Sequence, residues 1–415
     1  MVNRLLLLAF LAVPYAPPGF AAAPNTAPAI FAQMDQMTAA LSEITGWKPR
    51  KKVPANIISK TNFERYIKDQ LRDSSTQKEL KQQETALKML GLVPNDFDLA
   101  QQTADVLSEQ AAAYYDYRKK KLFVIDATPE GDDQRLALVH ELAHALADQQ
   151  HALGKYLQAA AANPDEASAR EAVMEGQATW LTWAFEEKRA GRRAEVPPGL
   201  IDQLTQPFES SQAFPALSAA PLYLRESLLF PYNAGARFQD AVFRRLGRPA
   251  FEEVFAHGPR STQQIMHPAA YLDDRDTPLA ATPSYEEILG ARGKQYKGVI
   301  QSSLGEFEHV ILLRQHLGRE YASIASHWRG GGFRLYEEKT KSRNPKKPLL
   351  IYWSSWDSPT AAQQYFDLYQ RVQNAKWKNV IIESKNATEI RGESDSGKFV
   401  LRLRGTSVQS VEGMR

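Results

Sequence analysis

A short apolar segment, residues 136–146, constrains this chain more than any other feature of its sequence. It contains His140, Glu141 and His144, and its other residues are almost all alanine, valine and leucine. A helix with apolar side chains on nearly every side is predicted to be buried. Two imidazoles and a carboxylate are costly to bury unless they bind something. We therefore expect a core built around this helix and a ligand for its polar residues.

The spacing of these three residues indicates which ligand they bind. His140 and His144 stand four positions apart, so their side chains lie about 40° apart around a helix axis and can bind one ion. Glu141 is offset by about 100° from His140, which lets its carboxylate reach a water at that ion without being a ligand itself. The pattern predicts His140 and His144 as metal ligands and Glu141 as the general base of a hydrolase.

The composition narrows the choice of metal. The chain has no cysteine, which excludes disulfides, thiolate metal sites and a cysteine nucleophile. The expected ion is Zn²⁺, which catalytic sites hold with three protein ligands and an open water position. The metzincin pattern does not fit, because Ala147 and Gln150 occupy the positions that would require Gly and His. We expect His151 to be a polar residue at the helix end and no ligand.

The third ligand is expected in the next helix, where the sequence reads Glu175-Gly176-Gln177-Ala178. With the histidine motif, this string resembles the gluzincin metallopeptidases, in which a downstream helix supplies a Glu ligand. The resemblance implies that Glu175 completes the zinc site and that the long intervening segment holds an insertion around 156–164. Glu171 remains an alternative, since it lies four residues earlier on the same helix face. We expect Gly176 to let this helix approach the motif helix closely.

Three further residues are candidate catalytic groups by their type. A zinc peptidase needs a donor aimed at the oxyanion of the tetrahedral intermediate, commonly Tyr or His. Tyr232, His267 and Tyr271 fit that requirement. Their segments, 230–235 and 259–271, look similar to parts of a group of secreted, largely uncharacterised bacterial proteins with a zinc-peptidase motif. That similarity assigns no role to them, so packing and turn roles stay open.

Periodicity and composition divide the chain into four parts. Residues 1–23 combine Arg4, an apolar run and a small-residue stretch, which predicts a signal peptide cleaved near Ala22. Residues 24–112 predict a helical region, with helices at 62–71 and 77–90. Residues 113–301 predict a mainly helical domain that begins with a β-hairpin at 113–125, and the resemblance to the gluzincins implies that this is a zincin-like catalytic domain. The motif helix is expected to run towards Gly154 and later helices to break at prolines such as Pro231.

Residues 302–415 predict a smaller α+β domain with its own core and no zinc ligand. The fold class expected for the whole chain is therefore α+β. Most strand-like runs of this chain lie in that C-terminal part, which also contains one predicted helix and a basic hairpin loop at 339–347. The strands are expected at 310–313, 333–336, 349–353, 380–382 and 399–403, and the helix at 360–372.

Charge and hydropathy limit the partners and the location. Lys and Arg number 51 and Asp and Glu 48, a balance that argues against nucleic acid as a partner. The predicted signal peptide indicates a secreted or periplasmic protein. No apolar run reaches the roughly 20 residues that span a bilayer, so we expect no stable membrane insertion. The resemblance to the gluzincins implies a peptide or protein substrate and an exposed edge strand in the predicted hairpin, with which such a substrate can pair. Two alternatives stay open: a non-catalytic zinc protein that binds a partner, and a metallohydrolase acting on cell-wall amides.

Overall fold

The structure is a computed structural model that describes residues 27–72, 74–128, 131–206, 214–274, 279–339 and 348–414. The predicted signal peptide, 1–23, and nearly all of the predicted basic loop lie outside the described residues. Among the residues that are described, no helix is both long enough and apolar enough to span a membrane.

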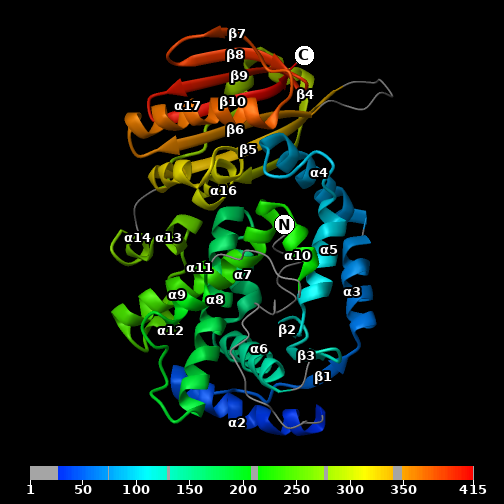
Figure 1. Cartoon of the computed structure of the whole chain (residues 1–415), viewed down its shortest axis with the longest axis vertical. Coiled ribbons are helices and arrows are strands. Elements are labelled where there is room, and N and C mark those ends of the chain that lie inside the picture. The colour runs from blue at the N-terminus through cyan, green and yellow to red at the C-terminus, as the bar shows by residue number, and fades with distance from the viewer. Residues whose placement is uncertain are drawn as a thin grey trace.

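Helices surround the histidine motif in the larger part of the molecule (Figure 1). The motif lies in α6, Asp132–His151, which packs against α2, Ala27–Thr45, and α8, Pro164–Arg189. In turn α8 packs extensively against α11, Leu222–Leu246. The other helices of this part are α3 Lys60–Arg72, α4 Ser74–Leu90, α5 Leu99–Gln110, α7 Leu153–Ala159, α9 Leu200–Leu204, α10 Pro215–Ala219, α12 Ala250–Ala256, α13 Thr262–Met266, α14 Pro268–Leu272 and α15 Tyr285–Leu289.

A three-stranded sheet lies beside the motif helix. The predicted hairpin is confirmed as β2, Ala113–Asp116, and β3, Lys121–Ile125. Strand β1, Ala55–Ile58, pairs in parallel with β3, so the order is β1-β3-β2 and β2 is an edge strand next to α6. The sequence did not predict β1, because four residues are too few to show a strand period.

Two predicted helix boundaries in this part are wrong. Helix α6 ends at His151 instead of Gly154, because Ala152 adopts a left-handed conformation with φ of 51° and Gly154 lies inside α7. Helix α11 continues through Pro231. A proline removes only one helical N–H bond, and the burial of this helix against α8 keeps the helix continuous.

The C-terminal part is built on an antiparallel sheet of seven strands in the order β4-β5-β6-β10-β9-β8-β7. Figure 1 shows this sheet at one end of the molecule, with α17, Pro359–Lys376, lying across one of its faces. The strands are β4 Tyr296–Ser303, β5 Trp328–Glu338, β6 Pro348–Trp356, β7 Ile381–Lys385, β8 Glu389–Ser394, β9 Gly397–Arg404 and β10 Ser407–Met414; the remaining helices are α16 Glu306–Leu317 and the 3-10 segments Gly290–Gln295 and Arg319–His327.

The predicted α+β class holds for this architecture, with two corrections. The expected strand at 310–313 lies within helix α16. Four apolar residues in a row fit a buried helix as well as a strand, and Glu308, which accepts a hydrogen bond from the backbone N–H of Gly305, favours the helix start. A boundary at 301/302 would cut β4, so the C-terminal unit begins near Tyr296.

The two parts share their main hydrophobic core, so the expectation that the C-terminal part has only a core of its own is wrong. The larger cluster of buried apolar residues runs from Met34 in α2 to Val408 in β10. A second, smaller cluster lies mostly on the C-terminal sheet and consists of Tyr285, Tyr336, Leu349, Ile351 and Val411. Contacts between α4 and β6 and between α11 and α16 join the two parts. The sequence period identified the sheet but could not show which helices would cover it.

A buried ion pair helps to join α4 to the C-terminal sheet. Lys376 Nζ lies 2.8 Å from Glu412 Oε2, and both side chains are at most 2% exposed. Lys376 also donates to the backbone oxygen of Met89 at the end of α4, at 2.9 Å. Glu412 accepts further hydrogen bonds from Tyr369 and Trp377. The ammonium of Lys376 and the carboxylate of Glu412 therefore both have hydrogen-bond partners in addition to each other.

We predict that Lys376→Met destabilises the protein by about 3–5 kcal/mol, because it leaves the Glu412 carboxylate buried without its counter-ion. Urea denaturation measures the change. Lys378→Met is the matched control, since Lys378 is exposed two positions away. A loss below about 1 kcal/mol in Lys376→Met, or an equal loss in both variants, would contradict this role of the ion pair.

Candidate metal centre

The three predicted ligand side chains meet at one point between α6 and α8. The Nε2 atoms of His140 and His144 lie 3.0 Å apart. Glu175 Oε2 lies 3.1 Å from the first of these nitrogens and 3.2 Å from the second. All three residues are at most 9% exposed. Among the described residues, this is the one group of His, Asp and Glu side chains that could hold a metal ion.

The separations of these atoms fit a tetrahedral ion. Ligands at about 2.0–2.2 Å from Zn²⁺ lie about 3.3–3.6 Å from one another in tetrahedral geometry. The observed separations of 3.0, 3.1 and 3.2 Å are slightly shorter, so small side-chain movements would bring the three atoms to those distances. Two imidazoles and a carboxylate also leave one coordination position open, as catalytic zinc sites do.

Two of the three groups are held in the charge states that bind metals. Burial alone would raise the pKa of Glu175, but His144 and His140 outweigh it and hold this pKa well below its usual range. Burial lowers the pKa of His140 to about 4, against the opposing effect of Glu175. For His144 the carboxylate of Glu175 prevails over burial and raises the pKa. The ionised carboxylate and the neutral His140 imidazole are ready to bind an ion, whereas His144 must release its proton when an ion binds.

Glu141 lies beside this group without belonging to it. Its side chain is buried, and desolvation raises its pKa to about 7, a value suited to a general base near neutral pH. The backbone of Tyr115 in β2 lowers this pKa in opposition to burial. The Tyr115 hydroxyl donates to Asp148 Oδ2 at 2.9 Å, also on α6. Tyr115 thus joins the edge strand to the motif helix.

Glu171, the alternative ligand, is buried one helical turn before Glu175 but is not part of the ligand group. Desolvation raises its pKa well above the usual value, and the Glu175 charge raises it further. A protonated carboxyl is a poor metal ligand. The position of Glu171 outside the group and its raised pKa both favour Glu175 as the third ligand.

Gly176 has a different partner from the one expected. It faces α11 instead of α6: a Cβ at Gly176 would lie 2.0 Å from the backbone carbon of Gly235, and a Cβ at Gly235 would lie 2.1 Å from the backbone oxygen of Ala172. Adjacent helical residues point about 100° apart. Glu175 can therefore face α6 while Gly176 permits the close approach of α11.

The three candidate oxyanion residues lie in different places. The ring of Tyr232 lies 6.0 Å from the ring of His140, and the two residues line the same cavity. His267 and Tyr271 are not brought to the ligand group, which corrects the expectation for both. The Tyr271 hydroxyl donates to the backbone oxygen of His257 at 2.8 Å, so this side chain packs in the core.

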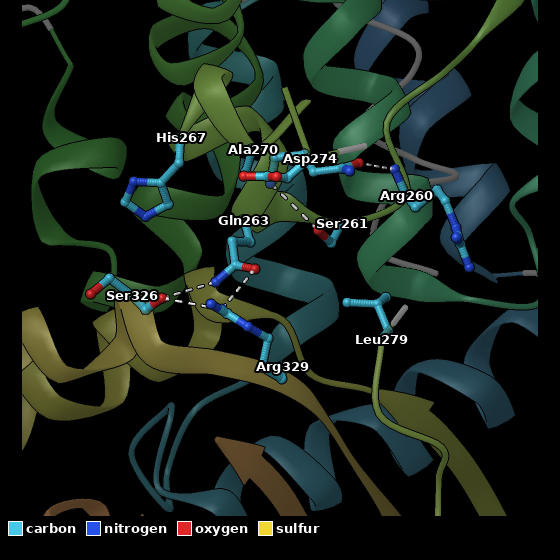
Figure 2. Close-up of a pocket in the computed structure, with 10 residues that line it drawn as sticks. Arg260, Ser261, Gln263, His267, Ala270, Asp274, Leu279, Ser326 and Arg329 are labelled. Carbon is cyan, nitrogen blue, oxygen red and sulfur yellow. Dashed lines mark hydrogen bonds between the residues drawn. The ribbon is translucent and has the colours of Figure 1, made fainter. Parts of the chain in front are cut away.

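His267 pairs with Glu306 at 2.7 Å and lines a second cavity of about 250 Å³. Figure 2 shows this cavity, in which the Gln263 side chain contacts Arg329 and the backbone of Ser326. None of the residues that line it belongs to the ligand group. Tyr232 is therefore the one candidate of the three that the fold places at the site.

His151 is placed as predicted, at the last position of α6 and outside the ligand group. Its ring stacks on Phe255 with centroids 4.5 Å apart and lies near Glu252.

A cavity of about 340 Å³ reaches the site from the side of His140. His140 and Tyr232, which line it, were predicted from the sequence, whereas sequence reasoning did not assign the other lining residues to the site, including Gln110 at the end of α5. Thr179 and Trp183 also line it, and they stand four and eight positions after Glu175. Helical spacing from Glu175 could have identified these two, whereas Gln110 carries no such signal.

The comparisons with known proteins inform only the C-terminal part. Residues 294–415 match a family described as a domain of unknown function, DUF8575. The match begins two residues before β4, in agreement with the corrected boundary. No curated protein and no solved structure matches the chain.

We predict that Gly176→Ala destabilises the protein by at least about 2 kcal/mol, because its methyl group would overlap the backbone of α11 and force the two helices apart. Thermal unfolding of the variant and of the wild type measures the loss of stability. Gly293→Ala serves as control, since the nearest atom to a Cβ there lies 3.6 Å away. Equal stability of Gly176→Ala and wild type would show that the helices are not in contact here.

Proposed function

We propose that this protein is a zinc-dependent metallopeptidase of gluzincin type, with a zincin-like catalytic unit formed by α6, α8 and the β1-β3-β2 sheet. The observation that supports this most strongly is the convergence of His140, His144 and Glu175 at near-tetrahedral separations, with Glu141 beside them and outside the group. The first and last of these residues, His140 and Glu175, are 35 positions apart in the sequence. They lie on two helices that pack together.

The chemistry follows from the side chains. A zinc ion at the three ligands would supply a Lewis acid that makes a water more acidic and polarises a peptide carbonyl. Glu141 accepts the proton of the attacking water at its carboxylate and returns it to the departing amine, so one residue acts first as base and then as acid. Tyr232 is the proposed donor to the developing oxyanion.

The edge strand β2 pairs on one side with β3 and lies next to α6. A peptide that extended this sheet would pass close to the ligand group. The four residues of β2 are buried, so such pairing would require the segments that cover this edge to move. The peptide or protein substrate is therefore proposed from the ligand group and Glu141. The N-terminal pattern at residues 1–23 further leads us to propose that the protein acts outside the cytoplasm.

We predict that Glu141→Gln retains zinc but hydrolyses peptides at least about a hundredfold more slowly, because general-base catalysis typically contributes 10²- to 10⁴-fold. Cleavage of a mixed peptide library, with zinc measured by elemental analysis, tests this. Glu79→Gln, an exposed change on α4, controls for the loss of one carboxylate. Full activity in zinc-loaded Glu141→Gln would refute the mechanism, and an inactive wild type would favour a non-catalytic zinc protein.

We predict that Glu175→Ala abolishes tight zinc binding, whereas Glu171→Ala weakens it by at most about 10- to 100-fold, the usual effect of losing a residue that only supports a ligand. Zinc titration of the two variants side by side measures this, with circular dichroism to verify folding. If Glu171→Ala loses zinc and Glu175→Ala keeps it, the two assignments must be exchanged.

A further inference from the structure

Two basic runs that are far apart in the sequence lie side by side in the fold. The first, residues 48–52, reads Lys-Pro-Arg-Lys-Lys, and the second, residues 118–121, reads Arg-Lys-Lys-Lys. Strand β1 pairs in parallel with β3, with Ala55 opposite Leu122, and the backbone N–H of Leu122 donates to the backbone oxygen of Pro54 at 2.9 Å. The residues that precede β1 therefore lie beside those that precede β3, which form the turn of the hairpin.

The end of α6 holds the first run in place. The side-chain oxygen of Gln149 accepts hydrogen bonds from the backbone N–H groups of Arg50 and Lys51 at 2.6 and 3.0 Å. Trp47 and Val53, which flank the run, are both buried. The backbone of the run is thus anchored at both ends and in the middle, and its charged side chains are exposed.

The second run is fixed to the same end of α6. Asp116 Oδ1 accepts hydrogen bonds from the backbone N–H groups of Arg118 and Lys119, both at 3.0 Å, which orders the turn. Lys120 Nζ lies 2.6 Å from Oδ2 of Asp148, the residue before Gln149. Lys120 also has a φ of 53°, a left-handed conformation in which Gly or Asn is more usual. The turn therefore carries lysine at a position where the backbone favours a smaller residue.

The two runs together, which we call the basic surface, have a large excess of positive charge. Seven of their eight Lys and Arg residues are exposed, and the eighth is half-buried. Three of the eight are paired with a carboxylate: Lys52 with Asp35, Lys119 with Asp116, and Lys120 with Asp148. Within the described ranges, no ion pair joins a carboxylate to the other five, which are Lys48, Arg50, Lys51, Arg118 and Lys121. The whole chain has a net charge of only +3, so its total charge hides this local excess.

The position of the basic surface favours a flat, polyanionic partner. Its cations lie on a hairpin turn and on the segment beside that turn, in the half of the molecule away from the C-terminal sheet (Figure 1). Each Lys or Arg near an anionic lipid surface strengthens binding by about fivefold, without insertion of the chain. The N-terminal pattern at residues 1–23 predicts export, which disfavours nucleic acid and leaves phospholipid headgroups as an accessible source of phosphate.

We propose that the basic surface docks this protein on a membrane rich in anionic phospholipids, through attraction between its Lys and Arg side chains and the headgroup phosphates. The inference goes beyond the proposed peptidase function and does not depend on it. Gln149, which holds the basic surface, stands five positions after the ligand His144 on α6. Docking would therefore hold the metal centre close to the membrane.

The test measures sedimentation of the full chain with lipid vesicles. One set contains phosphatidylglycerol and phosphatidylcholine in equal parts, and the other contains phosphatidylcholine alone. Binding is measured at about 0.1 M and at about 1 M salt, where charges are screened beyond about 10 Å and about 3 Å. Duplex DNA and inorganic phosphate are titrated separately.

Two variants lose three positive charges each. The surface variant changes cations that have no carboxylate partner: Arg50→Gln, Lys51→Gln and Arg118→Gln. The control variant changes three exposed cations on or beside the C-terminal sheet: Lys297→Gln, Lys378→Gln and Arg404→Gln. Circular dichroism verifies that both fold. The single change Arg118→Gln, in the exposed turn, gives a second measure that does not depend on the triple variant.

We expect the wild type to bind the anionic vesicles at the lower salt concentration and to leave them at the higher one, with no binding to neutral vesicles. The surface variant should bind at least about tenfold more weakly and Arg118→Gln about fivefold more weakly, because each change removes one headgroup attraction. The control variant should bind like the wild type.

Four results would overturn the inference. They are absence of binding to anionic vesicles, equal binding to neutral vesicles, equal loss in the surface and control variants, and binding to DNA or to inorganic phosphate that requires the same three residues while vesicles do not bind. Peptide cleavage is not part of this measurement, so a failure of the proposed peptidase function would leave the result unchanged.

Discussion

The packing of α6 against α8 is the constraint on which the rest of the site depends. The motif helix supplies two imidazoles, and within the described ranges it is α8 that brings a carboxylate to within 3.2 Å of both. The position of α8 is set in turn by its contact with α11, where Gly176 and Gly235 allow the backbones to meet. An ionised Glu175 beside two buried histidines stabilises this packing and prepares a binding site for a cation.

Elements next to α6 and α8 set the environment of the proposed general base, Glu141. The edge strand β2 reaches α6 through Tyr115, which contacts both the Glu141 carboxylate and Asp148. Burial of Glu141 raises its pKa towards neutrality, where a carboxylate can both accept and release a proton. A cavity with a mostly apolar wall lies beside His140. The base and two of the ligands thus come from α6 itself, and the third ligand comes from α8.

The C-terminal sheet is fastened to the helical part by polar as well as apolar contacts. Lys376 and Glu412 form a fully buried pair next to the end of α4. Gln315 and His316 of α16 both donate to the backbone oxygen of Gly91, just after that helix, at 2.7 Å. The segment that matches DUF8575 is therefore continuous with the core of the helical part and contributes none of the described ligand atoms.

The sequence by itself determined what depends on local geometry. Helical spacing placed His140, Glu141 and His144 correctly relative to one another, and alternation revealed the β2–β3 hairpin, because both patterns repeat within a few residues. Tertiary structure alone decided which distant groups meet. It brought Tyr232 near His140, left His267 and Tyr271 elsewhere, turned Gly176 towards α11 and enclosed Gln110 beside the site. These outcomes depend on how whole helices pack, and no local period of the chain encodes that packing.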